Sequence, residues 1–197
     1  TPVDDWELRN TAAGFSGLGY MLVPSPSATS DGTTGGSALG PPTVGNGPRM
    51  EYDINFTTTG RFIIWVRGWN EYTARAGNND SIFIGFRPEG STTVNPLIVQ
   101  APTATTVDNS QMSGWGAAGW DWRSDRGSGS DPFAFTNSTP GIHTFIIYSR
   151  EDGTLIDKIV LEPGARAAGN SAEPATASNN GGHGDGETWD WAMAPTQ

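Results

Sequence analysis

Hydrophobic and polar residues alternate with a period of two in several segments of the chain. In residues 50–56 (MEYDINF), the even positions are apolar and the odd positions are polar. Successive side chains of a β-strand point to opposite faces, so this pattern is typical of a half-buried strand. A turn at 57–60 (TTTG) leads into 61–67 (RFIIWVR), which is apolar on both faces and predicts a central strand.

Similar short segments recur along the chain and predict an all-β fold. Further strands are expected at 6–9, 20–23, 81–87, 96–100, 119–123, 141–149 and 155–161. No segment between them has the apolar periodicity of a helix. We therefore expect an antiparallel β-sandwich, a jelly roll of about nine short strands.

Three segments depart from this pattern and suggest how the chain is organised. Residues 25–48, rich in Ser, Gly, Thr and Pro, predict a long loop, and 163–186 read as a linker. The interpretation is a sandwich domain over residues 1–162 and a Gly/Ala/Ser-rich tail over 163–197. Whether the two tryptophans of that tail fold back on the domain or begin another module is left open.

The order of the predicted strands gathers the long loops at one end of the sandwich. Alternate connections between antiparallel strands emerge at the same end. The connections of one end are 24–48, 68–80, 101–118 and 150–154, and they carry most of the aromatic residues outside the strands. Loops held by a rigid sheet are a common place for a binding site.

Composition narrows the possible partners. The formal net charge is −10, from 21 acidic and 11 basic residues, which argues against binding nucleic acid or an anionic membrane surface. The absence of cysteine excludes disulfides and thiol chemistry. No segment is apolar enough to span a bilayer. The chain starts at Thr-Pro and is interpreted as a mature or excised segment of a secreted protein, expected to be monomeric.

Catalytic side chains are not evident. His143 falls in a predicted strand and is expected to face solvent, while His183 falls in the linker, and neither has a nucleophile at a recognisable spacing. Glu151 and Asp152 are adjacent, so their side chains diverge and do not easily flank one glycosidic bond. We expect no catalytic residue, although a small polysaccharide lyase or glycoside hydrolase stays an alternative.

Asp157 is unusual because it interrupts an apolar strand. By alternation it shares a face with Leu155, Ile159 and Leu161, which should be the core face. A buried carboxylate needs a partner, because an isolated charge is costly to bury. One alternative is an arginine or backbone donors. The other is a structural Ca²⁺, with Glu7 as the second ligand.

The tryptophans divide into core and surface candidates. Trp65 and Trp6 are expected in the core, and Trp122 is expected to pack on its sheet. An exposed indole in a cleft suits the apolar face of a sugar ring, while nearby polar side chains bond its hydroxyls. The candidate ligand-binding residues are Trp69, Tyr72, Asn79, Trp115, Trp120, Arg150 and Glu151.

Several of these segments together resemble a known group of domains. Residues 50–67, Asn-Asp-Ser at 79–81, Trp-Asp-Trp at 120–122 and 141–163 are similar to β-sandwich carbohydrate-binding modules of bacterial polysaccharide-degrading enzymes, of the type of families 6 and 35. The resemblance covers roughly residues 6–162.

In such modules glycan binds at the loop end. The resemblance implies Trp115 or Trp120 as the stacking platform and Glu151 or Asp152 as the hydroxyl partner. It also implies structural calcium on Glu7 and Asp157, although the first strand has one acidic residue where a Glu-x-Glu pair is common.

The expected function is a non-catalytic module that targets an appended secreted enzyme to a polysaccharide. Marine algal polysaccharides (agarose, porphyran, carrageenan or alginate) are suggested by the resemblance, and plant xylan and pectin stay open. A structural or adhesive sandwich of a surface protein is a further alternative, in which the tryptophans contact protein.

Overall fold

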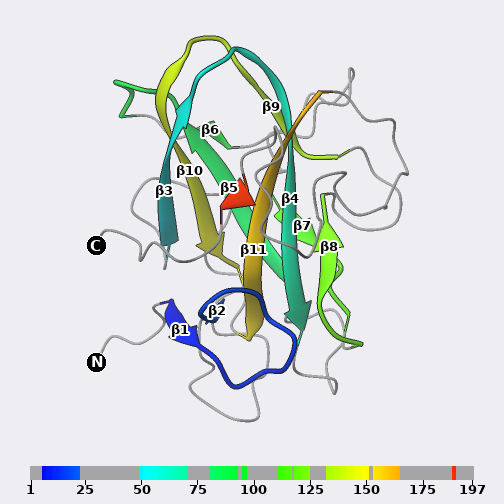
Figure 1. Cartoon of the computed structure of the whole chain (residues 1–197). Coiled ribbons are helices and arrows are strands. Elements are labelled where there is room, and N and C mark those ends of the chain that lie inside the picture. The colour runs from blue at the N-terminus through cyan, green and yellow to red at the C-terminus, as the bar shows by residue number, and fades with distance from the viewer. Residues whose placement is uncertain are drawn as a thin grey trace.

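The structure of the chain is a computed structural model (Figure 1). It describes residues 6–22, 49–70, 80–92, 95–96, 111–116, 118–124, 132–150, 153–164 and 188–189. All regular structure in these ranges is β-strand, arranged in two antiparallel sheets. The same ranges contain no helix that is long and apolar enough to cross a membrane. The predicted all-β sandwich is confirmed, and the jelly-roll connectivity stays a prediction.

Sheet A has seven strands in the part of the chain that the structure describes. Its main path is β1 (Glu7–Arg9), β2 (Tyr20–Leu22), β11 (Thr154–Pro163), β4 (Gly60–Asn70) and β8 (Asp121–Arg123), with β9 (Ala134–Asn137) also on β4 and β12 (Thr188–Trp189) also on β11. The long strands β4 and β11 therefore form its centre, as the apolar pattern of 61–67 predicts.

Sheet B is smaller, with five strands among the described residues. Its path is β3 (Arg49–Phe56), β10 (Gly141–Ser149), β5 (Ser81–Arg87) and β6 (Asn95–Pro96), and β7 (Gln111–Ser113) also pairs with β5. The expected strands at 50–56, 81–87 and 141–149 are confirmed. The strands β7, β9 and β12 were not predicted, because they are short and lack a clear alternation.

The main core lies between the two sheets. It includes Ile64 and Val66 of β4 together with Ile84 of β5 and Ile147 of β10. The opposite face of β4 is also apolar, because Ile63 and Trp65 pack there in a second cluster with Trp122, Ala134 and Val160. Trp65 is fully buried, as predicted, and Trp6 is partly buried against the main core.

The predicted alternation of residues 155–161 is wrong in one respect. The pairing of β11 with β4 shifts register between Ile156 and Lys158, which makes a β-bulge at Asp157. Ile159 and Leu161 lie in the main core, whereas Leu155 packs in a different cluster with Tyr20 and Leu22. The extra residue separates Leu155 from Ile159, so the four residues predicted on one face do not share it.

His143 does not face solvent, contrary to the sequence-based expectation. It is 2% exposed and stacks on Phe86 at a centroid separation of 5.3 Å. The backbone N–H of Glu89 donates to its Nδ1 at 3.0 Å, so the other ring nitrogen, Nε2, carries the proton and donates to the Thr139 carbonyl at 2.8 Å. Both ring nitrogens therefore have hydrogen-bond partners in the backbone.

Two residues of the tail pair with a strand of the domain. Thr188 and Trp189 of β12 pair with Val160 and Ile159 of β11, and Figure 1 shows β12, in red, beside that strand. The question that the sequence leaves open is thereby answered for these two residues.

Candidate functional site

The strand ends that flank the predicted long loops meet at one end of the sandwich. Asn70, the last residue of β4, pairs with Thr154, the first of β11. At the start of β5, the Ser81 hydroxyl accepts a hydrogen bond of 2.6 Å from Nη1 of Arg150, which follows β10. The prediction that alternate connections emerge at the same end is therefore confirmed for these strand ends. Tyr72, Asn79, Glu151 and Asp152 lie outside the described residues.

Asp80 is a polar group at this end that the sequence argument did not select as a ligand residue. Burial raises the pKa of its carboxyl group, while Arg150, the N–H of Gly114 and Arg123 act in the opposite direction without cancelling the effect. The backbone carbonyl of Asp80 also accepts a hydrogen bond of 3.1 Å from the Gly114 N–H. Arg150 thus belongs to a small network of charged groups at this end of the sandwich.

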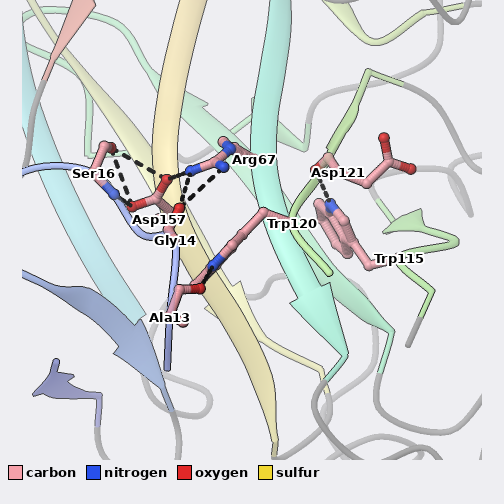
Figure 2. Close-up of polar contacts among 8 residues, drawn as sticks. All are labelled: Ala13, Gly14, Ser16, Arg67, Trp115, Trp120, Asp121 and Asp157. Carbon is pink, nitrogen blue, oxygen red and sulfur yellow. Dashed lines mark hydrogen bonds and ion pairs between the residues drawn. The ribbon is translucent and has the colours of Figure 1, made fainter. Parts of the chain in front are cut away.

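Trp115 does not present an exposed ring. It is 1% exposed and belongs to the main core, and its Nε1–H donates to the Asp121 carbonyl at 3.1 Å. A stacking platform needs an accessible ring face, so the prediction that Trp115 is such a platform is not supported by this structure. It anchors the glycine-rich segment that leads to β8, as Figure 2 shows.

Gly68 makes this burial possible. A Cβ atom at that position would lie 2.7 Å from Cε2 of Trp115 and 2.9 Å from the Leu155 carbonyl oxygen. This glycine, near the C-terminal end of strand β4, therefore lets the indole pack directly on the strand. A glycine inside an otherwise apolar strand is a signal of such a close approach, and it was available in the sequence.

Trp69 and Trp120 remain partly exposed and touch each other. Trp69 lies within β4 rather than in a loop, and its ring meets the ring of Trp120 edge-on at 5.7 Å. Trp120 also meets Tyr20 edge-on at 5.5 Å, and Phe15 packs on the same group. We call these four residues the outer aromatic cluster, because they cover the face of sheet A that points away from the main core.

The two indole N–H groups of this cluster differ in their partners. The Nε1–H of Trp69 is buried and has no acceptor within the described residues. The indole of Trp120, in contrast, donates from Nε1 to the Ala13 carbonyl at 2.9 Å. The cluster therefore combines partly exposed aromatic surface with one buried indole N–H that lacks an acceptor among the described residues.

A buried ion pair lies beside the outer aromatic cluster. Asp157 is fully buried, and its carboxylate forms an ion pair with Arg67 of β4. The backbone N–H of Ser16 donates to the same carboxylate at 2.7 Å, and the Ser16 hydroxyl lies 3.1 and 3.2 Å from its two oxygens. Arg67 also donates from both terminal nitrogens to the Gly14 carbonyl at 3.2 Å (Figure 2).

This donor set does not fit a calcium ion shared by Asp157 and Glu7. Arg67 and Ser16 are hydrogen-bond donors, whereas calcium needs oxygen ligands. Glu7 is exposed and paired with Arg9, and β2 lies between its strand and β11. The described residues hold no group of three or more His, Cys, Asp or Glu side chains placed to bind a metal. The arginine and backbone donors of the first alternative are what Asp157 contacts.

The sequence thus predicted the kind of partner that Asp157 has, as one of two alternatives, but it did not identify Arg67 and Ser16. Arg67 precedes Asp157 by 90 residues, a separation that belongs to no motif, and the bulge at Asp157 cannot be read from the residues. The sequence did contain one signal: a carboxylate buried in an apolar strand needs a hydrogen-bond donor.

Comparison with known proteins gives one family. The family described as "Glycosyl hydrolase family 115 C-terminal domain" matches residues 9–173 of the chain. No curated protein matches the chain.

Two solved structures are similar at 13% sequence identity. One is a GH26-CBM35 β-(1,4)-mannanase of Podospora anserina, with a TM-score of 0.47 over 82% of this chain and 25% of that one. The other is a cycloisomaltooligosaccharide glucanotransferase of Paenibacillus sp. in complex with cycloisomaltoheptaose, with a TM-score of 0.42 over 81% and 17%. The chain thus spans a quarter or less of the length of either protein.

Proposed function

We propose that this chain, which belongs to the family of glycosyl hydrolase family 115 C-terminal domains, is a non-catalytic carbohydrate-binding module of a larger secreted enzyme. Membership of the family supports a sugar-related role and a catalytic domain elsewhere in the parent chain. A module of this kind keeps its enzyme near an insoluble or dilute substrate by raising the effective concentration.

The observation that carries the proposal is the outer aromatic cluster. Trp69 and Trp120 are both partly exposed beside the end of the sandwich where β4 ends and β11 begins. Large aromatic surface that stays accessible to solvent is typical of a binding site. An indole offers a flat apolar contact to the C–H face of a pyranose, and the partly exposed rings of Trp69 and Trp120 are placed to supply it.

The finer features of the proposal come from the sequence. The type is that of families 6 and 35, and the ligand is a polysaccharide, with agarose, porphyran, carrageenan and alginate as first candidates and xylan and pectin next. Arg150, Tyr72, Asn79 and Glu151 are proposed to complete the site. The proposed module is monomeric.

Affinity electrophoresis of the chain through gels that contain each of these six polysaccharides tests the proposal. At least one is expected to retard the chain, and Trp120→Ala is expected to reduce that retardation. Trp122→Phe is the matched control, because Trp122 is 9% exposed and packs in a different cluster. If the folded chain migrates unretarded in all gels, the module proposal is rejected, and release of sugar products would favour the hydrolase or lyase alternative.

A further inference from the structure

One short turn of the N-terminal segment is held by side chains from three separate parts of sheet A. The turn comprises residues 13–16. Trp120 binds the carbonyl of Ala13, Arg67 binds the carbonyl of Gly14, and Asp157 accepts hydrogen bonds from Ser16. Figure 2 shows these three side chains converging on the turn, Arg67 from within β4, Asp157 from within β11 and Trp120 from just before β8. We call the turn together with Arg67 and Asp157 the clamp.

The local backbone of the turn suits this arrangement. Gly14 has a φ of +83°, which favours glycine, and a Cβ at Gly14 would lie 3.4 Å from Cδ1 of Trp120. The turn thus fits closely against the edge of the indole. Any shift of the turn moves the acceptor of the only hydrogen bond that the Trp120 ring makes in the described part of the chain, since the indole has a single donor.

Arg67 connects the buried charge to the indole. One of its terminal nitrogens contacts both the Asp157 carboxylate and the Gly14 carbonyl, the other contacts the same carbonyl, and the guanidinium carbon lies 5.5 Å from the Trp120 ring centroid. Arg67 lies within hydrogen-bonding distance of Asp157 and Gly14 and within cation–π distance of the indole. Its side chain is 22% exposed, so it lies between the buried carboxylate and the partly exposed indole.

We propose that Arg67 is a positioning residue for glycan binding, which acts by holding the turn 13–16 and so fixes the orientation of Trp120. This inference rests on the proposed function for its ligand, but the orientation of Trp120 is a separate physical claim. Asp157 keeps Arg67 in place, and Arg67 keeps in place the carbonyl next to the one that Trp120 binds.

The substitution Arg67→Lys separates positioning from simple charge pairing. Lysine retains a positive charge for Asp157, but it has one nitrogen where arginine has a planar fork that serves two acceptors. Arg61→Lys is the matched control, because Arg61 lies on the same strand β4 and outside the clamp. Trp120→Phe identifies the Trp120 indole N–H signal in the NMR spectrum of the ¹⁵N-labelled chain.

We expect Arg67→Lys to accelerate hydrogen exchange of the Trp120 indole N–H and to weaken binding of the polysaccharide that retards the wild type by about tenfold, the effect of one lost charge-assisted hydrogen bond. Arg61→Lys should change neither quantity. Unchanged exchange in Arg67→Lys overturns the proposal, even where affinity falls, because Arg67 would then touch the ligand directly. Faster exchange with unchanged affinity overturns it as well, since orientation would not govern binding.

The proposed function can fail separately. If no polysaccharide retards the wild type, glycan binding is rejected for the chain and the ligand part of this inference falls with it. The exchange rate of the indole N–H in Arg67→Lys still decides whether Arg67 holds Trp120.

Discussion

The face of sheet A and its edge each carry an acid–base pair, in opposite surroundings. On the face, Asp157 is fully buried and Arg67 is 22% exposed. At the edge, Glu7 and Arg9 of β1 are 50% and 44% exposed. The two carboxylates look alike in the sequence, where both are candidate metal ligands. In the structure one ties three segments of the fold together and the other lies on a short exposed strand.

Burial decides how much each pair contributes. Two exposed charges are well solvated whether or not they pair, so a surface pair contributes between zero and about 1 kcal/mol. A buried carboxylate has lost its water and depends on the donors around it. Asp157 therefore contributes to stability mainly because its removal would leave its hydrogen-bond donors unpaired, and less through its attraction to those donors.

Removing each carboxylate in turn should show the largest difference between the two pairs. Asp157→Ala is expected to lower the free energy of unfolding by about 3 kcal/mol, the low end for a broken buried pair, because Arg67 is still partly solvated. Glu7→Ala should lower it by less than about 1 kcal/mol. Urea unfolding followed by tryptophan fluorescence measures both.

A double variant tests whether the cost of an unpaired charge explains the loss of stability in Asp157→Ala. Asp157→Leu with Arg67→Met removes both charges, and it should be closer in stability to the wild type than Asp157→Ala is. If instead the double variant is the less stable of the two, the attraction within the pair, and not the cost of an unpaired charge, dominates.

The contrast between buried and exposed positions extends to the backbone next to Arg67. Gly68→Ala places a Cβ 2.7 Å from Trp115 and should cost about 1–3 kcal/mol through overpacking. Gly116→Ala is the control, because Gly116 is exposed and a Cβ there has 4.0 Å to its nearest neighbour. Thermal unfolding of both variants gives the measurement, and equal melting temperatures would contradict the close packing of Trp115.

These residues also show how far the sequence leads. Periodicity was sufficient for β3, β4, β5 and β10, because alternation or two-sided burial is a local property of the chain. The positions of Trp115 and Asp157 depend on a glycine in a neighbouring strand and on a bulge, which are tertiary features. The polar character of the loop end was predictable, whereas the charge network of Asp80 was not, since its partners come from separate strands.

Asp80 offers an intermediate case between the two pairs. Burial raises the pKa of its carboxyl group in the folded chain, despite the nearby Arg150. The folded state then holds a proton more tightly than the unfolded state, whose pKa is about 3.9, so the stability from this group is present below that value and is lost as pH rises through the folded pKa. Asp80→Asn should therefore be more stable than the wild type at pH 7.

The expected gain is below about 1 kcal/mol, because Arg150 and Arg123 already offset part of the burial cost. The gain should disappear below a pH of about 3.5, where the wild-type carboxyl is protonated in both states. Melting temperatures at the two pH values measure it, with Asp53→Asn on the exposed side of β3 as the control. A loss of stability at pH 7 would mean that the ionised Asp80 is held by its arginines.

The smallest effect is expected from calcium. Asp157 is paired with Arg67, and Glu7 is exposed and paired with Arg9. The described ranges therefore hold no pair of carboxylates placed to bind a cation. Melting temperatures in EDTA and in excess Ca²⁺ should then agree, since a ligand that does not bind the folded state does not stabilise it. A rise of several degrees with Ca²⁺ that is abolished in Asp157→Ala and Glu7→Ala would restore the site predicted from the sequence. It would also mean that Arg67 leaves the Asp157 carboxylate when the metal binds. The difference between the buried pair and the exposed pair would then not hold for the metal-bound protein.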